Sequence, residues 1–239
     1  MPSFGNKDQE IASPQEEADR ACHLREAETK AIALFDALKP LIQPSKLESK
    51  INSEIYELGV EQGVRTHWHK RIVRGGPNTL CPFAENPPDR ELEADDIVII
   101  DLGPVFEAWE ADFGRTYVLG SDPRKLALRD ALEPTWYAIK QRYDERPSMT
   151  GEELYAIGCE EARKRGYEWG ADIAGHIVGD FPHERIPNDR IGLYITPGCK
   201  VSMTDTGKGG CKRHWILEVH LRDPQLNRNG FFEQLLTVP

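Results

Sequence analysis

Several kinds of feature are missing from this 239-residue sequence, and each absence narrows its class. The cysteines are few, odd in number and without C-x-x-C spacing, so neither a disulfide framework nor a zinc knuckle is indicated. They are Cys22, Cys81, Cys159, Cys199 and Cys211. No stretch is apolar enough to cross a membrane, and the first residues lack the core of a signal peptide. We therefore expect a protein of the reducing cytoplasm that has no membrane partner.

Clusters of basic residues and linker-like stretches are absent as well. The chain has 40 acidic and 30 basic residues, a formal net charge of -10. This balance argues against nucleic acid as the main partner and favours a small molecule or a short peptide as substrate. The length is sufficient for one domain with a substantial core, or for two small halves packed together.

The spacing of apolar residues predicts several helices. An apolar position recurs every three or four residues over 14–38, which is typical of an amphipathic helix. The other expected helices begin at turn or capping residues, namely Ser45 with Glu48, Pro123, and Thr150 with Glu153.

Short strand-like segments with Gly and Pro turns follow each group of helices. Helices followed by antiparallel strands, twice over, predict an α+β fold made of two similar halves, although no sequence repeat proves this. We assign residues 1–44 to an N-terminal polar segment with an amphipathic helix, and residues 45–239 to a catalytic domain. The helix over 14–38 is also a candidate contact for a homodimer.

Two aspartates stand out because apolar strands carry them. Asp101 follows the run 97–100, which predicts a buried strand, and Asp112 lies eleven residues later. A buried carboxylate has a large desolvation penalty unless a cation or a partner neutralises it. A straight strand would separate the two by about 36 Å, whereas a turn at Gly103-Pro104 would bring them together. The pattern predicts a buried metal centre, the alternatives being a turn cap or a pair with Arg115.

Three downstream residues offer complementary chemistry. His176 lies among glycine and apolar residues, and His183 follows seven positions later, where an imidazole could bond a substrate carbonyl or an oxyanion. Glu218 lies in the apolar run HWILEVHL. Each has an ordinary alternative, because a lone histidine is often structural and a strand glutamate is often a surface charge. The order of these residues carries more information than any one of them.

That order resembles the pita-bread metallopeptidases, the family of methionine aminopeptidase, aminopeptidase P, prolidase and creatinase. The resemblance runs from about residue 45 to 239. It includes DIVIIDLG, the D-F-G-R-T after the second aspartate, the His-Glu pair at 183–184, and the closing Gly-x-x-x-x-Leu-Leu-Thr at 230–237. It implies a pita-bread fold, in which helices lie in a pseudo-two-fold arrangement over a curved antiparallel sheet.

The resemblance also implies roles for these residues. Asp101 would chelate one metal ion, Asp112 and Glu218 would bridge two ions, and His176 would bind the other. Such oxygen and imidazole ligands suit Mn, Fe, Co or Zn. Two divalent ions would hold a bridging hydroxide and polarise the scissile carbonyl, while His183 would stabilise the oxyanion. The implied activity is a metal-dependent hydrolase of the aminopeptidase or Xaa-Pro peptidase type that cleaves an amide bond in a small substrate.

The sequence departs from the family at the fifth metal ligand. In the family, a strand reading approximately G-M-V-F-T-I-E-P supplies a glutamate that also serves as proton shuttle. Counting from Gly198 places Thr204 at this position, and a one-residue bulge would place Asp205 there instead. We therefore expect a divergent fifth ligand, with Asp205 as the candidate for the metal and for the proton shuttle.

A second departure concerns substrate contacts. Family peptidases usually place a histidine about eighteen residues before the first aspartate to contact the substrate, and this sequence has Phe83 there as the candidate substrate contact. This counts against ordinary methionine aminopeptidase activity. His67 and His69, spaced for one face of a strand, are candidate replacements, a solvated strand edge being the alternative. Trp68 and Trp109 are candidates for an apolar substrate pocket, although tryptophan is more often found in cores.

The altered ligand leaves other functions open on the same fold. A non-hydrolytic enzyme with one or two irons, or a catalytically silent binding protein, is also compatible with the sequence.

Overall fold

A computed structural model describes residues 12–183 and 191–238 of the chain. The four α-helices are α1 (Pro14–Leu38), α2 (Glu48–Glu61), α3 (Pro123–Glu145) and α4 (Gly151–Lys164). The first six strands are β1 (Val64–His67), β2 (Ile72–Gly75), β3 (Ile97–Leu102), β4 (Pro104–Phe106), β5 (Trp109–Glu110) and β6 (Phe113–Val118). The remaining strands are β7 (Glu168–Trp169), β8 (Ile177–Val178), β9 (His214–Asp223) and β10 (Arg228–Leu235).

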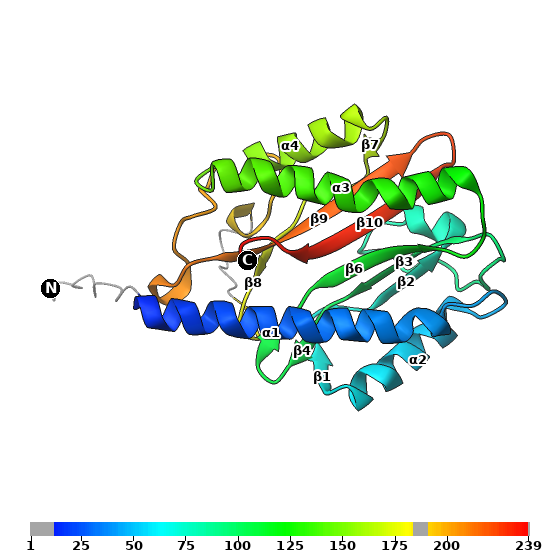
Figure 1. The fold of residues 1–239 in the computed structure, drawn as a ribbon, viewed down its shortest axis with the longest axis horizontal. Helices are drawn as coiled ribbons and strands as arrows, with labels where there is room; N and C mark the ends of the chain where they lie inside the picture. Colours follow the sequence, from blue (N-terminus) through cyan, green and yellow to red (C-terminus); the bar gives the residue numbers. More distant parts are fainter. Residues whose placement is uncertain (1–11, 184–190, 239) are drawn as a thin grey trace, which may run out of the picture.

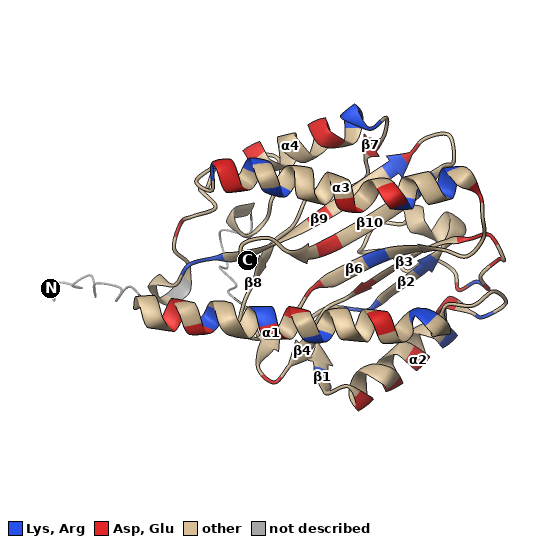
Figure 2. Ribbon diagram, in the orientation of Figure 1, with Lys and Arg blue, Asp and Glu red and all other residues tan. Residues whose placement is uncertain are grey.

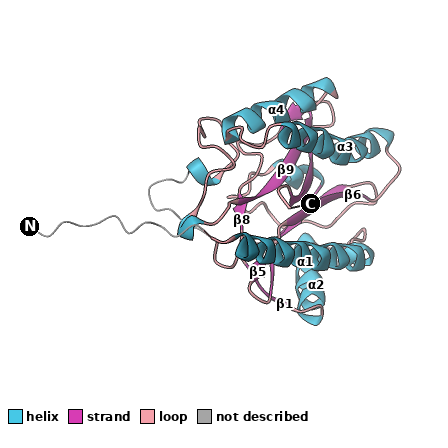
Figure 3. Cartoon of the chain, turned by 60° about the vertical axis from the view of Figure 1, so that its left-hand side comes forward, coloured by secondary structure: helices cyan, strands magenta, loops and turns pink. Residues whose placement is uncertain are grey.

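One antiparallel sheet runs through the middle of the molecule. Its strand order is β2-β3-β6-β10-β9-β7, with β8 paired to β9 off this path, and a small second sheet has the order β1-β4-β5. The first half of the chain supplies β2, β3 and β6, and the second half supplies β10, β9 and β7. Helices α1 and α2 accompany the first group, and α3 and α4 the second (Figure 1). Figure 3 shows the same two helix pairs from another side.

Each helix pair has its own hydrophobic core against its half of the sheet. The first core joins α1 and α2 to β3 and β6, and its fully buried members include Leu34, Ile51 and Ile100. The second joins α3 and α4 to β9 and β10 around Trp136 and Leu217. Two similar halves were expected from the sequence, and the arrangement agrees with that expectation.

The helix predicted over 14–38 is confirmed. Ser13 caps it, since its hydroxyl accepts a hydrogen bond from the Glu16 backbone N–H while the Glu16 carboxylate accepts one from the Ser13 N–H. The apolar face of α1 lies in the first core, together with residues from beyond position 45. The division at 44/45 stays a prediction.

One predicted capping box is present and one is not. Thr150 and Glu153 form theirs at the start of α4. Helix α2 begins at Glu48 without a side-chain cap, and the Glu48 carboxylate turns inward to accept hydrogen bonds from the Gly75 N–H and the Asn78 side chain. The predicted capping box of Ser45 with Glu48 was wrong, because the Glu48 carboxylate instead accepts a hydrogen bond from the buried backbone N–H of Gly75.

Within the described residues, no helix has both the length and the apolar character needed to cross a bilayer.

Replacing Leu34 by alanine tests whether α1 belongs to the folded core. Leu34 is fully buried, whereas Ile32 on the same helix is 43% exposed. We expect Leu34→Ala to lower the free energy of unfolding by about 2–5 kcal/mol, because it leaves a cavity. Ile32→Ala should change it by about 0.5 kcal/mol or less. Urea unfolding measures both, and equal small effects would show that α1 is not part of the cooperative unit.

Candidate metal centre

The first two acidic residues converge through the pairing of β3 with β6. Asp101 lies near the end of β3, and Asp112 lies immediately before β6. The strands are antiparallel, with Asp101 opposite Gly114. The chain returns through the hairpin of β4 and β5 and not through the single turn expected at Gly103-Pro104. The expected convergence is nevertheless achieved, because the hairpin leaves the β3–β6 register intact.

His176 and Glu218 approach the same point from the second half of the chain. The Nε2 atom of His176 lies 3.0 Å from Oδ2 of Asp112 and 3.6 Å from Oε1 of Glu218. Nδ1–H of His176 donates to the carbonyl of Ile177 at 2.7 Å, which fixes the ring. The other oxygen of Glu218 lies 2.9 Å from Nε2 of His220. Both His176 and Glu218 are buried.

The last strand adds an acid that was not predicted from the sequence. Glu233 of β10 is 2% exposed and lies directly opposite Glu218 of β9 and Gly114 of β6. Side chains of directly opposed residues lie on the same face of a sheet. Glu233 is also an acid within an apolar run, FFEQLL, which is the signal that drew attention to Glu218. Figure 2 shows acidic positions on these central strands as well as along the helices.

The structure does not bring Thr204 or Asp205 into this cluster. Both are exposed, in a segment of turns and not a strand. The Asp205 backbone N–H donates to the carbonyl of Ser202, and the Thr204 hydroxyl bonds with that of Ser202. Glu218 lies in β9, the penultimate strand, and the last strand β10 carries Glu233. The fifth buried ligand candidate is therefore Glu233.

The two histidines of THWHK have different surroundings. Strand β1 ends at His67, so a bend separates it from His69, contrary to the expectation of one shared strand face. The His67 ring lies 6.3 Å from that of Tyr56 on α2. His69 points into the acidic cluster, with Nε2 at 3.1 Å from Oδ1 of Asp112 and 3.5 Å from Oδ1 of Asp101.

Two of the three aromatic candidates lie near the cluster. The Trp68 ring packs edge to face against the rings of His69, His176 and His183, with ring centroids 4.4, 5.0 and 5.1 Å apart. Phe83 is 52% exposed and lies 5.6 Å from the His69 ring. Trp109 instead stacks on His23 of α1 at 5.0 Å.

His183 is held by a buried acid that was also not anticipated. Glu110 of β5 is 1% exposed. One of its oxygens accepts a hydrogen bond from Nδ1 of His183 at 2.8 Å, and the other accepts the His183 backbone N–H at 3.0 Å. This pairing fixes the tautomer in which Nδ1 carries the proton, which leaves Nε2 of His183 for other partners.

The charges in the cluster strongly perturb one another. Burial raises the pKa of Asp101 to about 7. Burial also acts to raise the pKa of Asp112, but His69 and His176 together lower it to about 2. The pKa of Glu233 is raised well above its ordinary value by burial and then by the charges of Asp112 and Asp101. So many acids in one buried place indicate a site built for a cation.

Two carboxylate oxygens in the cluster accept no hydrogen bond, although one of them, Oδ1 of Asp101, lies 3.5 Å from Nε2 of His69. Oδ1 of Asp101 and Oε2 of Glu233 are buried and have no hydrogen bond from any described residue. The potential ligand atoms form two groups in which all atoms lie within 4.8 Å of one another, namely His69 with Asp101 and Asp112, and Asp112 with His176 and Glu233. Carboxylate and imidazole ligands in such groups fit divalent metal ions.

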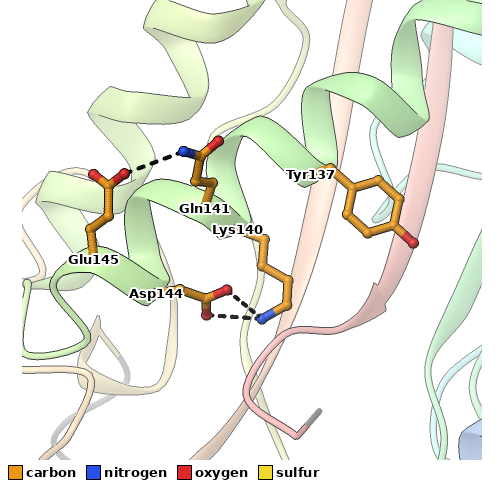
Figure 4. Close-up of a pocket in the computed structure, with 5 residues that line it drawn as sticks. All are labelled: Tyr137, Lys140, Gln141, Asp144 and Glu145. Atoms are coloured by element: carbon orange, nitrogen blue, oxygen red, sulfur yellow. Dashed lines mark hydrogen bonds and ion pairs between the residues drawn. The ribbon is translucent and has the colours of Figure 1, made fainter.

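A separate surface pocket contains nothing comparable. It is lined by Tyr137, Lys140, Gln141, Asp144 and Glu145, all from α3 (Figure 4). Lys140 pairs with Asp144 at 2.8 Å, and Gln141 bonds to Glu145 at 3.4 Å. Because these polar groups satisfy one another along the helix, the pocket offers no converging groups to a ligand.

The fold and the buried cluster define a protein with a site for divalent metal ions. The chain belongs to metallopeptidase family M24, whose sequence profile matches residues 22–205. Membership implies the use of divalent metal and confirms the family resemblance.

Relatives of known name support this assignment. The Xaa-Pro dipeptidase of Pyrococcus furiosus is 27% identical over 183 residues, which cover 74% of this chain and 50% of that protein. The probable dipeptidase PepE of Mycobacterium tuberculosis is 27% identical over 211 residues, 82% of this chain and 53% of that protein. The chain thus spans about half the length of the curated relatives it matches.

Solved structures confirm the pita-bread fold. The dipeptidase PepE from Mycobacterium ulcerans matches 94% of this chain and 56% of its own, with a TM-score of 0.72 and 22% identity. Methionine aminopeptidase from Thermotoga maritima matches 96% of this chain and 99% of its own, with a TM-score of 0.68 and 17% identity.

Binding of a divalent ion should release protons. In the metal-free protein, burial acts against the charged imidazole of His176, but its hydrogen bond and charge interaction with Asp112 raise its pKa to about 9. A metal ion must displace that proton, so we expect Mn²⁺ affinity to increase as the pH rises toward about 9. Titration calorimetry in buffers of different ionisation enthalpy measures the proton release. A binding heat independent of the buffer would contradict this account.

Proposed function

We propose that the chain is a metal-dependent peptidase that cleaves an amide bond in a short peptide or another small substrate. The observation that carries this proposal is the convergence of three buried carboxylates and the partly buried Asp101 with imidazole groups, in a chain of family M24. The named relatives are dipeptidases, which favours hydrolysis over an iron enzyme or a silent binding protein.

We propose that two ions bind, chosen from Mn, Fe, Co or Zn. The two groups of ligand atoms share Asp112, whose two oxygens face different histidines. A carboxylate in this position would be able to hold both ions of a dinuclear site. Asp101 would serve the first ion, and His176 and Glu233 the second. Glu218, whose Oε1 lies 3.6 Å from Nε2 of His176, would be a further candidate for the second ion.

The protein's own residues would bind and orient the substrate. When bound, the metal ions supply an activated water and polarise the scissile carbonyl. His183, held by Glu110, would donate a hydrogen bond from Nε2 to the developing oxyanion only when that nitrogen also carries a proton. Trp68 and Phe83 would provide an apolar boundary for the substrate side chain. A homodimer and a cytoplasmic location stay predictions from the sequence.

The decisive experiment combines metal analysis with peptide turnover. Protein purified without added metal is analysed for its elements and then assayed against a dipeptide library with each candidate cation. We expect activity that a chelator removes and that returns with one of the four metals. Absence of both bound metal and turnover across the library would overturn the proposal.

Asp101→Asn tests the first metal ligand. Loss of a residue that only hydrogen-bonds to a metal ligand typically costs roughly 10–100-fold. We expect Asp101→Asn to lower kcat/KM by more than this, because an amide is a far poorer metal ligand than a carboxylate. Asp95→Asn is the control, since that side chain is exposed and pairs with Lys125. Wild-type activity in Asp101→Asn would sink the assignment.

Glu110→Gln tests the orientation of His183. The two oxygens of Glu110 accept hydrogen bonds from the backbone N–H and from Nδ1 of His183, whereas the amide of glutamine has only one oxygen to accept them. We therefore expect kcat to fall by about 100-fold while the metal content stays constant. Steady-state kinetics with elemental analysis measures both. Unchanged kcat would mean that His183 does not depend on Glu110 for its role.

A further inference from the structure

His69 has the features of a metal ligand, although the sequence suggested a substrate contact for it. We infer that His69 supplies a nitrogen ligand to the ion held by Asp101 and Asp112, so that each half of the centre has its own imidazole. This inference rests on the proposed metal-dependent function and adds a histidine to the ligand set that the family resemblance implied.

The two imidazoles are held in the same way. Nδ1–H of His69 donates to the carbonyl of Lys70 at 2.7 Å, just as Nδ1–H of His176 donates to the carbonyl of Ile177 at 2.7 Å. In both cases the acceptor belongs to the next residue along the chain. A backbone carbonyl that binds one ring nitrogen fixes the tautomer and directs the other nitrogen to a metal.

The Nε2 atoms of the two imidazoles face different oxygens of one carboxylate. Nε2 of His69 lies 3.1 Å from Oδ1 of Asp112, and Nε2 of His176 lies 3.0 Å from Oδ2. Nε2 of His69 is also 3.5 Å from Oδ1 of Asp101. Two atoms that bind one ion at about 2.1 Å are separated by about 3.0–3.4 Å in octahedral or tetrahedral geometry. The separations around His69 are therefore close to those of atoms that share an ion.

The fold makes room for His69 at the strand that carries Asp101. A Cβ atom at Gly103 would lie 2.3 Å from Cδ2 of His69 and 2.4 Å from Nε1 of Trp68. The Trp68 backbone N–H donates to the carbonyl of Gly103 at 2.9 Å, which holds the Trp68-His69 segment against β3. The absence of a side chain at position 103 is thus what allows the imidazole to reach Asp101.

The surroundings of His69 favour a metal over a substrate as its partner. Its side chain is only 8% exposed, and both ring nitrogens are committed, one to a carbonyl and one to the carboxylates. A histidine that contacts substrate needs a nitrogen directed toward open space. The Phe83 ring, in contrast, is exposed beside it.

Proton NMR of the protein loaded with Co²⁺ tests this inference without relying on activity. An imidazole bound to cobalt through Nε2 shows its Nδ1–H as a strongly shifted, solvent-exchangeable signal. With two equivalents of Co²⁺ bound, we expect two such signals in the wild type and one in His69→Ala. His23→Ala is the matched control, since it removes a half-exposed imidazole on α1 and should leave both signals.

Metal titration supplies a second measurement. We expect His69→Ala to weaken one of the two Co²⁺ sites by about 10-fold or more and to leave the other nearly unchanged. The more conservative His69→Gln, which keeps a polar side chain of similar length, should give the same pattern.

The outcomes separate this inference from the proposed function. A wild type that binds two Co²⁺ ions and hydrolyses peptides but shows one exchangeable signal would overturn the role of His69 alone. Unchanged Co²⁺ affinities in His69→Ala with a raised KM would instead assign His69 to the substrate and also overturn the inference. A wild type that binds no Co²⁺ would overturn the proposed function itself.

Discussion

Repulsion among buried carboxylates is the constraint on which this structure depends. Asp101, Asp112, Glu218 and Glu233 share a small volume from which water is largely excluded. Two like charges 4 Å apart repel by about 4 kcal/mol at the effective dielectric constant of a protein near its surface. Without metal, burial and this repulsion raise the pKa of Glu233 well above its ordinary value, and the carboxylates, against the effect of burial, raise the pKa values of His69 and His176 to about 10 and 9. A divalent cation would offset the same repulsion and would also supply the Lewis acid for catalysis.

Each half of the fold contributes two of the four clustered carboxylates. The first half brings Asp101 and Asp112 together through the β3–β6 pairing, and the second brings Glu218 opposite Glu233 in the hairpin of β9 and β10. The pairing of β6 with β10, where Gly114 lies opposite Glu233, joins the two pairs of acids. A Cβ at Gly114 would lie 2.1 Å from the Phe231 ring, so the glycine of the D-F-G segment is needed for this contact.

Around the acids lies a layer of groups that fix orientation. The carbonyls of Lys70 and Ile177 hold two imidazoles, His220 holds one oxygen of Glu218, and Glu110 holds His183. Such partners limit the freedom of the groups that touch metal or substrate, and their loss commonly costs 10–100-fold in affinity or activity. Most of them come from positions next to a predicted site residue in the sequence, yet their roles depend on which way each side chain points.

The sequence by itself determined the helices, the strands and the apolar setting of Asp101, Asp112, His176 and Glu218, because periodicity and isolated acids in apolar runs are local features. It did not determine the fourth carboxylate of the cluster, which is the fifth ligand candidate. Counting along the chain pointed to Thr204 or Asp205, whereas the register of the last hairpin brought Glu233 to the cluster. It also did not separate His67 from His69, since the bend after β1 was not visible in the spacing. These questions were decided by strand register and backbone direction, which depend on contacts between residues far apart in the chain and so exist only in the tertiary structure.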